Sequence, residues 1–235
     1  MLAGFIDSIA GGGGLISLPA YYLYLSPHLA AGTNKVSASI GAIASVLRYS
    51  RSKNIDWLPA LLATAGTIPG AYFGAQALKA IDERIILKAM IVLLPLLCVF
   101  LIFRRGAIQR VKSVGKWKYP VYAAIGLVVG FYDGMVGPGT GTFLILLFSG
   151  VTGMAPLMAS GTAKVVNLAS GLSSLVSFMR GSYVYWRLGM AAGAFSVAGN
   201  LIGSGLAIKR GAKVIQGVLV AVLALILVTL ILRVL

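Results

Sequence analysis

The chain has 235 residues, of which 59% are hydrophobic and only 11% are charged, and its mean hydropathy is +0.95. A soluble domain usually carries about 25% charged residues, so the composition excludes a soluble globular fold. The net charge of +15 would suggest a nucleic-acid partner in a soluble protein. Here the basic residues cluster between apolar runs, which is how membrane topology is set. We therefore expect a lipid bilayer around the chain and no nucleic-acid partner.

Apolar segments follow one another along the whole chain. Runs of about 18 or more residues with few charges predict membrane-spanning helices. The predicted fold class is therefore an all-α polytopic membrane protein with about eight transmembrane segments. The first half has apolar segments at 1–25, 33–50, 58–79 and 86–103, and the second half at 119–148, 156–179, 188–208 and 213–232.

The second half of the chain repeats the first in the same order. Gly-Phe-Ile-Asp at 4–7 is matched by Gly-Phe-Tyr-Asp at 130–133, and later residues match as well, Trp57 by Trp186 for example. An ordered series of matches indicates a duplication. We therefore predict two homologous four-segment repeats, at 1–105 and 119–235, joined by a basic cytoplasmic linker at 106–118.

The basic loops predict the orientation in the membrane. Simple alternation of the segments places the loops near 48–57, 104–118 and 180–187 on one side, together with the C-terminus. Cytoplasmic loops carry an excess of Lys and Arg, so we expect this side, with both termini, to be cytoplasmic. Four spans per half would make the repeats parallel, whereas a re-entrant first segment would make them inverted, and both types occur in transporters. The sequence leaves this choice open.

Glycine-rich breaks interrupt the first segment of each half, at 11–14 and at 137–141. In a helix interior Gly costs about 1 kcal/mol and Pro about 3 kcal/mol relative to Ala, so neither segment can continue as one smooth helix. Broken segments at matching positions of two repeats point to a transporter's binding site, and helix N-termini attract anions. Close helix packing through glycine is the alternative. We expect backbone groups of the breaks to contact the substrate at Gly12, Gly13, Gly14, Gly139, Thr140 and Gly141.

A second repeated motif, Gly-Thr-x-Lys-Val, places Lys35 and Lys164 at the start of apolar runs. An ionisable group inside a membrane segment is a functional hypothesis by default. We expect both ammonium groups to bind an anion, with hydroxyl donors from Thr33 and Thr162. The alternative is that the lysines extend from helix ends to the membrane interface.

Two kinds of polar residue, aspartate and asparagine, complete the candidate site. Asp7 and Asp133 are two of only five acidic residues, and each lies just before a glycine-rich break. They are candidates for coupling to a proton or for a structural pairing with a lysine, and the sequence does not separate these roles. Asn34 and Asn167 lie near the lysines and are further candidate contacts of the substrate.

No catalytic constellation is present in the sequence. There is a single histidine and a single cysteine, which argues against a zinc site, and there is no cluster of carboxylates or nucleophile motif. We expect no enzyme activity, no metal and no cofactor.

Together these motifs resemble the TauE/SafE family of membrane permeases, the sulfite exporter or toluene sulfonate uptake family. Gly-Phe-Ile-Asp-Ser-Ile-Ala-Gly-Gly-Gly-Gly-Leu at 4–15 and Gly-Thr-Asn-Lys at 32–35 look like its first repeat. Gly-Phe-Tyr-Asp-Gly-Met-Val-Gly-Pro-Gly-Thr-Gly at 130–141 and Ala-Lys-Val-Val-Asn at 163–167 look like its second. The resemblance implies a multi-pass protein of the bacterial inner membrane that handles sulfite or a small organosulfur anion. Only three residues precede the first motif, so its segment is expected to be shorter than its counterpart.

The predicted function is a secondary transporter that moves a small anion, sulfite or an organosulfonate, across the bacterial inner membrane. Export is slightly favoured, because the negative cell interior repels an anion. A non-transporting membrane scaffold or subunit and a channel-like anion pore stay open as alternatives. Proton coupling and a homodimer also stay open.

Overall fold

The computed structural model describes residues 1–82, 84–85, 118–211, 214 and 217–218. The apolar segments expected at 86–103 and 213–232, and the linker at 106–118 except for its last residue, lie outside or almost wholly outside these ranges. The described part of the chain is helical and contains no strand. Its helices are α1 (Leu2–Ala10), α2 (Gly14–Tyr22), α3 (Pro27–Arg51), α4 (Trp57–Lys79), α6 (Lys118–Met135), α7 (Thr140–Thr152), α8 (Pro156–Arg180) and α9 (Trp186–Arg210).

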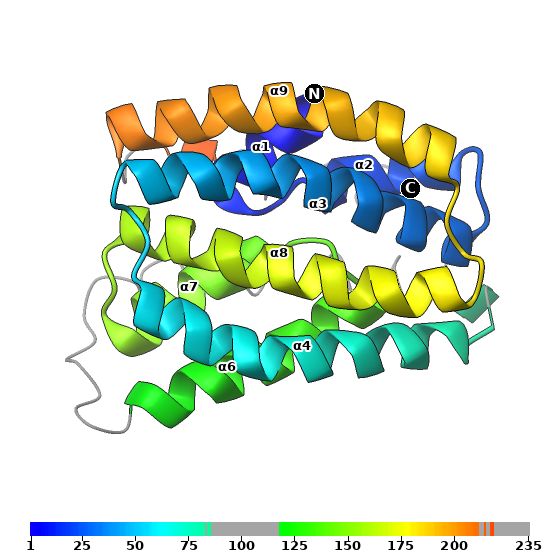
Figure 1. The fold of residues 1–235 in the computed structure, drawn as a ribbon, viewed down its shortest axis with the longest axis horizontal. Coiled ribbons are helices and arrows are strands. Elements are labelled where there is room, and N and C mark those ends of the chain that lie inside the picture. Colours follow the sequence, from blue (N-terminus) through cyan, green and yellow to red (C-terminus); the bar gives the residue numbers. More distant parts are fainter. Residues whose placement is uncertain (83, 86–117, 212–213, 215–216, 219–235) are drawn as a thin grey trace, which may run out of the picture.

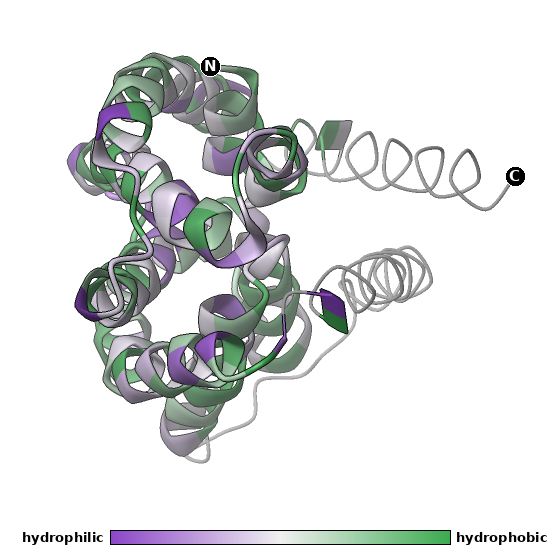
Figure 2. Cartoon of the chain, turned by 90° about the vertical axis from the view of Figure 1, so that its right-hand side faces the viewer, coloured by the Kyte–Doolittle hydropathy of each residue, from purple (hydrophilic) through white to green (hydrophobic). Residues whose placement is uncertain are grey.

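The helices form two bundles that do not coincide with the two halves of the sequence (Figure 1). The first bundle consists of α1, α2 and α3 with α9, which packs along α1 and α3. The second bundle consists of α6, α7 and α8 with α4, which packs along α6 and α8. Figure 2 shows the bundles end-on, one above the other. Each half of the sequence therefore contributes its fourth described helix to the bundle of the other half.

The long helices α3 and α8 meet between the bundles and run in opposite directions (Figure 1). Gly32 near the start of α3 lies against Tyr183, just beyond the end of α8. Gly161 near the start of α8 lies against Asn54, just beyond the end of α3. Gly32 and Gly161 are equivalent residues of the repeated motif. Because α3 and α8 are antiparallel, they make the same kind of contact at opposite ends of the interface.

Both glycine-rich breaks are present, and at each of them the chain turns back. In the first, Gly11 ends α1 with a φ of 73°, and Gly13 lies beside the backbone of Ala3 and the side chain of Asp7. In the second, Gly137 and Gly139 have φ values of 88° and 80°. Glycine takes up this left-handed region without the steric cost that a Cβ imposes. The segments expected as single units at 1–25 and 119–148 are therefore pairs of helices, and this is a correction.

The turn-backs also correct the expected placement of the basic loops. The loop between α3 and α4 and the loop between α8 and α9 lie at opposite ends of the molecule (Figure 1). Arg48 donates to the Leu201 carbonyl on the second half of α9, whereas Arg180 donates to Tyr72 on the second half of α4. The prediction that loops 48–57 and 180–187 share one side is wrong, because each glycine break adds a reversal that simple alternation does not count.

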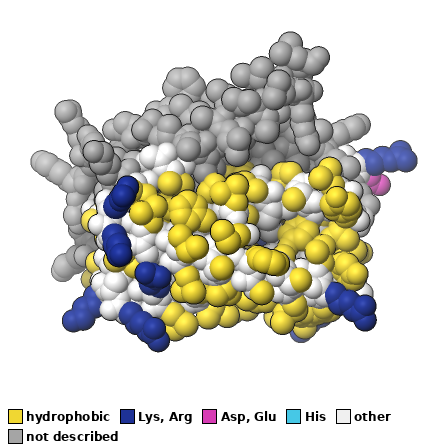
Figure 3. Space-filling model, turned by 90° about the horizontal axis from the view of Figure 1, so that it is seen from above, with side chains coloured by type: hydrophobic (Ala, Val, Ile, Leu, Met, Phe, Trp, Pro, Cys, Tyr) yellow, Lys and Arg dark blue, Asp and Glu magenta, His cyan; other side chains and the backbone are white. Residues whose placement is uncertain are grey.

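The surface has an apolar middle with basic ends. Figure 3 shows hydrophobic side chains covering the centre of one face, with Lys and Arg gathered toward its two ends. Large exposed side chains on this and other faces include Leu61, Phe73, Val128 and Phe195. By length and composition, α9 is the one helix among the described residues that is long and apolar enough to cross a membrane, and α7 is a shorter apolar helix.

Candidate functional site

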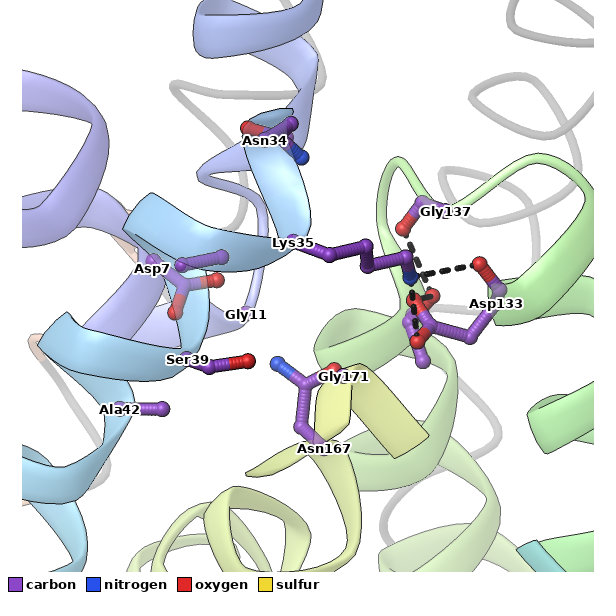
Figure 4. Close-up of a pocket in the computed structure, with 13 residues that line it drawn as sticks. Asp7, Gly11, Asn34, Lys35, Ser39, Ala42, Asp133, Gly137, Asn167 and Gly171 are labelled. Atoms are coloured by element: carbon purple, nitrogen blue, oxygen red, sulfur yellow. Dashed lines mark hydrogen bonds and ion pairs between the residues drawn. The ribbon is translucent and has the colours of Figure 1, made fainter. Parts of the chain in front are cut away.

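A small cavity lies at the interface of the two bundles, next to both glycine-rich breaks. Its volume is about 40 Å³, and it is called the central cavity below. The middle thirds of α3 and α8 face it, through residues such as Ser39 and Asn167, and Asp7 and Asp133 reach it from α1 and α6 (Figure 4). The site therefore lies near half the length of the longest described helices.

Two buried ion pairs join the bundles, and each crosses between the halves of the sequence. The Lys35 Nζ lies 2.7 Å from the Asp133 Oδ2, and the Lys164 Nζ lies 2.7 Å from the Asp7 Oδ2. The lysine side chains are 8% and 0% exposed, so neither extends to a membrane interface. Removing an ion from water costs several kcal/mol unless a close partner compensates, which explains why each ammonium group is paired.

The two carboxylates are held unequally. Asp133 accepts hydrogen bonds from Lys35, from the Thr140 hydroxyl at 2.6 Å and from the Ser170 hydroxyl. Asp7 accepts from Lys164 and from the Gly13 backbone N–H at 3.3 Å. The Asp7 side chain is 13% exposed and that of Asp133 is 5% exposed. Asp7 is therefore the more weakly held carboxylate and the one closer to solvent.

One buried polar group without a hydrogen-bond partner faces the central cavity. The Ser39 hydroxyl is buried and makes no hydrogen bond, and the Asn167 amide points toward it across the cavity (Figure 4). Asn34 also lines the cavity, and its Oδ1 accepts a hydrogen bond from Ser17 at 2.6 Å. Leaving a buried polar group unsatisfied costs about 1–3 kcal/mol, so donors of this kind favour a polar occupant.

The structure brings many of the predicted site residues together at the central cavity. Among the candidates from the sequence, the cavity lining includes Asp7, Gly14, Asn34, Lys35, Asp133, Thr140 and Asn167. Lys164 is one step removed, because its ammonium group contacts the cavity only through Asp7.

The two threonines of the repeated motif lie away from the cavity. The Thr33 hydroxyl accepts a hydrogen bond from the Tyr185 N–H, and the Thr162 hydroxyl accepts one from the Asp56 N–H, both at 3.0 Å. Tyr185 and Asp56 are the residues just before α9 and α4. Each threonine therefore fixes the start of a helix that belongs to its own bundle, which is a structural role.

The other glycines of the breaks have separate positions. Gly141 packs directly against Gly11 where the two breaks touch. Gly139 precedes α7 in a left-handed conformation, and the Gly12 carbonyl accepts a hydrogen bond from Leu15 in the first break. Gly13 lines a second, larger cavity of about 460 Å³ between α1, α2, α3 and α9. Asp7, Gly14, Asn34 and Ala38 line both cavities, so the two adjoin.

Sequence reasoning missed several residues on the cavity wall, among them Ser39 and Gly171. Each lies four residues after a predicted site residue, Ser39 after Lys35 and Gly171 after Asn167. Positions i and i+4 share one face of a helix, so this spacing was a signal that could have found both.

A match to a family of known proteins covers almost the whole chain. The sulfite exporter TauE/SafE family model matches residues 1–230. A probable membrane transporter protein of Sinorhizobium, ORF9, is 35% identical over 94% of this chain and 85% of its own length. YfcA of Escherichia coli strain K12, also named a probable membrane transporter protein, is 33% identical over 95% of this chain and 84% of its own length. A probable membrane transporter protein of Haemophilus influenzae is 31% identical over 93% of this chain and 86% of its own length.

No solved structure matches the chain. The family model and the relatives indicate the same kind of protein. The part of the chain that they match includes the cavity, the two glycine-rich breaks and the crossed ion pairs. The names of the family and of the relatives indicate a membrane transporter. On this evidence the chain belongs to the sulfite exporter TauE/SafE family.

Proposed function

We propose that the protein is a secondary transporter that moves a small oxyanion, sulfite or an organosulfonate, across the bacterial inner membrane. The single observation that carries this proposal is the central cavity, which the Lys35 ammonium group and the Asn167 amide line together with the Ser39 hydroxyl, a buried group without a hydrogen-bond partner. An oxyanion offers several acceptor atoms to such donors, and a charged donor makes the stronger hydrogen bonds.

The size of the cavity supports a small solute. Its volume of about 40 Å³ exceeds the roughly 10–15 Å³ that a cavity needs to hold one water molecule. The cavity therefore has room for only a few water-sized groups, which suits a compact solute. The name of the family supports sulfite within this class.

Inverted repeats provide the mechanism that we propose for access. The breaks touch at Gly11 and Gly141, and the crossed ion pairs come from matching motifs. Transporters with inverted repeats bind substrate at the repeat interface and alternate access by rocking one body against another. Here the bodies that move are the two mixed bundles rather than the two halves of the sequence, because α4 and α9 are exchanged.

The basic loops suggest an orientation. We propose that the end of the molecule with Arg48, Arg51, Lys53, Lys209 and Arg210 faces the cytoplasm, because basic loops stay inside. Helix α6 begins at this same end (Figure 1), and the basic residues of 106–118 precede it in the sequence. Export of an unaccompanied anion is favoured by about 2.3 kcal/mol per charge for each 100 mV.

Flux into proteoliposomes tests the proposal. Purified full-length protein is reconstituted, and uptake of sulfite and of methanesulfonate is measured against concentration. We expect uptake that saturates and that is lost in Lys35→Met, because the buried ammonium group at the cavity is removed. Lys209→Met, which removes a charge at the end of α9, is the matched control and should transport normally.

Three outcomes of this assay contradict the proposal. Absence of flux for every small oxyanion would favour a scaffold or subunit. Flux that rises linearly with concentration would favour a channel-like pore. Normal flux in properly inserted Lys35→Met would remove the central cavity as the site.

A further inference from the structure

The charges around the central cavity sum to zero before any substrate enters. The described groups there are two ammonium groups, Lys35 and Lys164, and two carboxylates, Asp7 and Asp133, in two ion pairs. A neutral set of this kind has little attraction for an anion. A bound monoanion would leave one uncompensated negative charge in a buried site, and such a charge is costly there.

A proton restores neutrality if one of the carboxylates accepts it. A nearby like charge disfavours the ionised form of a carboxylate, and the entering anion would supply that charge. The anion and the proton would then bind together, so that the site remains neutral when it is loaded.

Asp7 is the better acceptor of this proton for three reasons. Asp133 is stabilised as a carboxylate by Lys35, Thr140 and Ser170, whereas Asp7 has Lys164 and one long backbone hydrogen bond. The Asp7 side chain is the more exposed of the two. Asp7 also lines the larger cavity of about 460 Å³, whereas Asp133 does not.

Among the described residues that line the two cavities, Asp133 is the one acidic residue besides Asp7. The other titratable groups on neighbouring elements are Lys164 from α8, Lys35 and Tyr49 from α3, Tyr21 from α2, Tyr24 just after α2 and the amino group of Met1. Protonation of Asp7 leaves Lys164 as an uncompensated positive charge, and this charge favours binding of the anion.

We infer that Asp7 takes up one proton from solvent for each monoanion that binds, and releases it when the anion leaves. This inference rests on the proposed function and adds the coupling ion to it. Anion and proton move in the same direction, so the transport cycle is electroneutral. The membrane potential then gives no preference for export, and the proton gradient sets the direction.

Calorimetry on the purified full-length protein tests the inference. Binding of methanesulfonate and of sulfite is measured at one pH in two buffers with different heats of ionisation, which gives the number of protons taken up. We expect about one proton per monoanion for the wild type, the number that keeps the buried site neutral. Asp7→Asn should bind with about one proton fewer than the wild type, and this difference cancels any titration of the ligand itself.

Asp56→Asn, which changes an exposed carboxylate just before α4, is the matched control and should retain proton uptake. Asp133→Asn leaves Lys35 as an uncompensated positive charge, so this variant should also bind the monoanion with less proton uptake. Binding by the wild type without proton uptake would overturn the inference while leaving the proposed function intact. Loss of proton uptake in Asp133→Asn but not in Asp7→Asn would overturn the assignment to Asp7. Absence of binding by the wild type to any small oxyanion would overturn both the inference and the proposed function.

Proteoliposome flux gives a second readout that does not need an Asp7 variant to fold. We expect an inward proton gradient to drive uptake of methanesulfonate by the wild type, and an imposed membrane potential alone to have no effect. Uptake that follows the membrane potential and ignores the proton gradient would contradict an electroneutral cycle.

Discussion

At the scale of single residues, the two equivalent lysines have different roles in spite of their matching motifs. Lys35 lines the central cavity, whereas Lys164 is fully buried behind Asp7. The carboxylates they pair with also differ, because Asp133 accepts hydrogen bonds from the Ser170 and Thr140 hydroxyls, whereas the equivalent sequence positions in the first half are Gly41 and Gly14, which carry no hydroxyl.

Lys164→Met should therefore act mainly on stability. It leaves Asp7 as a buried carboxylate without its partner, and breaking a buried ion pair on one side costs about 3–5 kcal/mol. We expect a clear fall in the midpoint of thermal unfolding in detergent, with much of the loss recovered in Lys164→Met/Asp7→Asn. A thermal midpoint equal to that of the wild type would contradict the importance of this pair.

The sequence could identify the charged residues of the site but not their partners. The repeated motifs single out both lysines and both aspartates, because ionisable groups are rare in the apolar runs. Which lysine pairs with which aspartate depends on how the halves are arranged in space. The threonines were misleading for a similar reason, since their partners lie at the starts of distant helices.

At the scale of elements, glycines allow helices from different halves to touch along their backbones. Gly66, Gly70 and Gly74 on α4 face the backbone carbonyls of Ala123, Leu127 and Phe131 on α6. A methyl group at any of the three would overlap these carbonyl oxygens. On the opposite side of the molecule, Gly199 and Gly203 of α9 contact the backbone of α1 in the same way. Small residues of this kind let helix backbones approach closely in membrane proteins.

Gly70→Ala should separate α4 from α6 and lower stability by about 1–3 kcal/mol, the usual cost of overpacking. Gly150→Ala on α7 is the control, because a methyl group there would meet nothing within 4 Å. Both changes carry the same gain in helix propensity, so the difference between their thermal midpoints isolates the contact. Equal midpoints for the two variants would show that the helices are not in close contact.

The breaks themselves were predictable as interruptions but not as reversals. Four consecutive glycines rule out a regular helix, yet they do not say whether the chain continues or turns back. The positive φ angles at Gly11, Gly137 and Gly139 are what complete the turns. For this reason the segments at 1–25 and 119–148 were expected as single units, although each is a pair of helices.

At the scale of the whole molecule, the relative orientation of the two halves depends on whether each half reverses direction an odd or an even number of times. Composition alone predicts a helical membrane protein, and the repeated motifs predict two related halves. The choice between parallel and inverted halves, and the exchange of α4 and α9 between bundles, arise from contacts between residues far apart in sequence. No local pattern specifies such contacts.

Site-directed labelling in intact cells tests the inverted arrangement, on which the crossed ion pairs and the proposed rocking of the bundles depend. Lys53 and Ser182 hold equivalent places in the α3–α4 and α8–α9 loops, with φ values of 56° and 58°, and both side chains are exposed. In a Cys98→Ser background, Lys53→Cys and Ser182→Cys are treated with a membrane-impermeant maleimide. We expect labelling of position 182 in intact cells and of position 53 only after the cells are opened. Labelling of both positions in intact cells, or of neither before opening, would contradict the account.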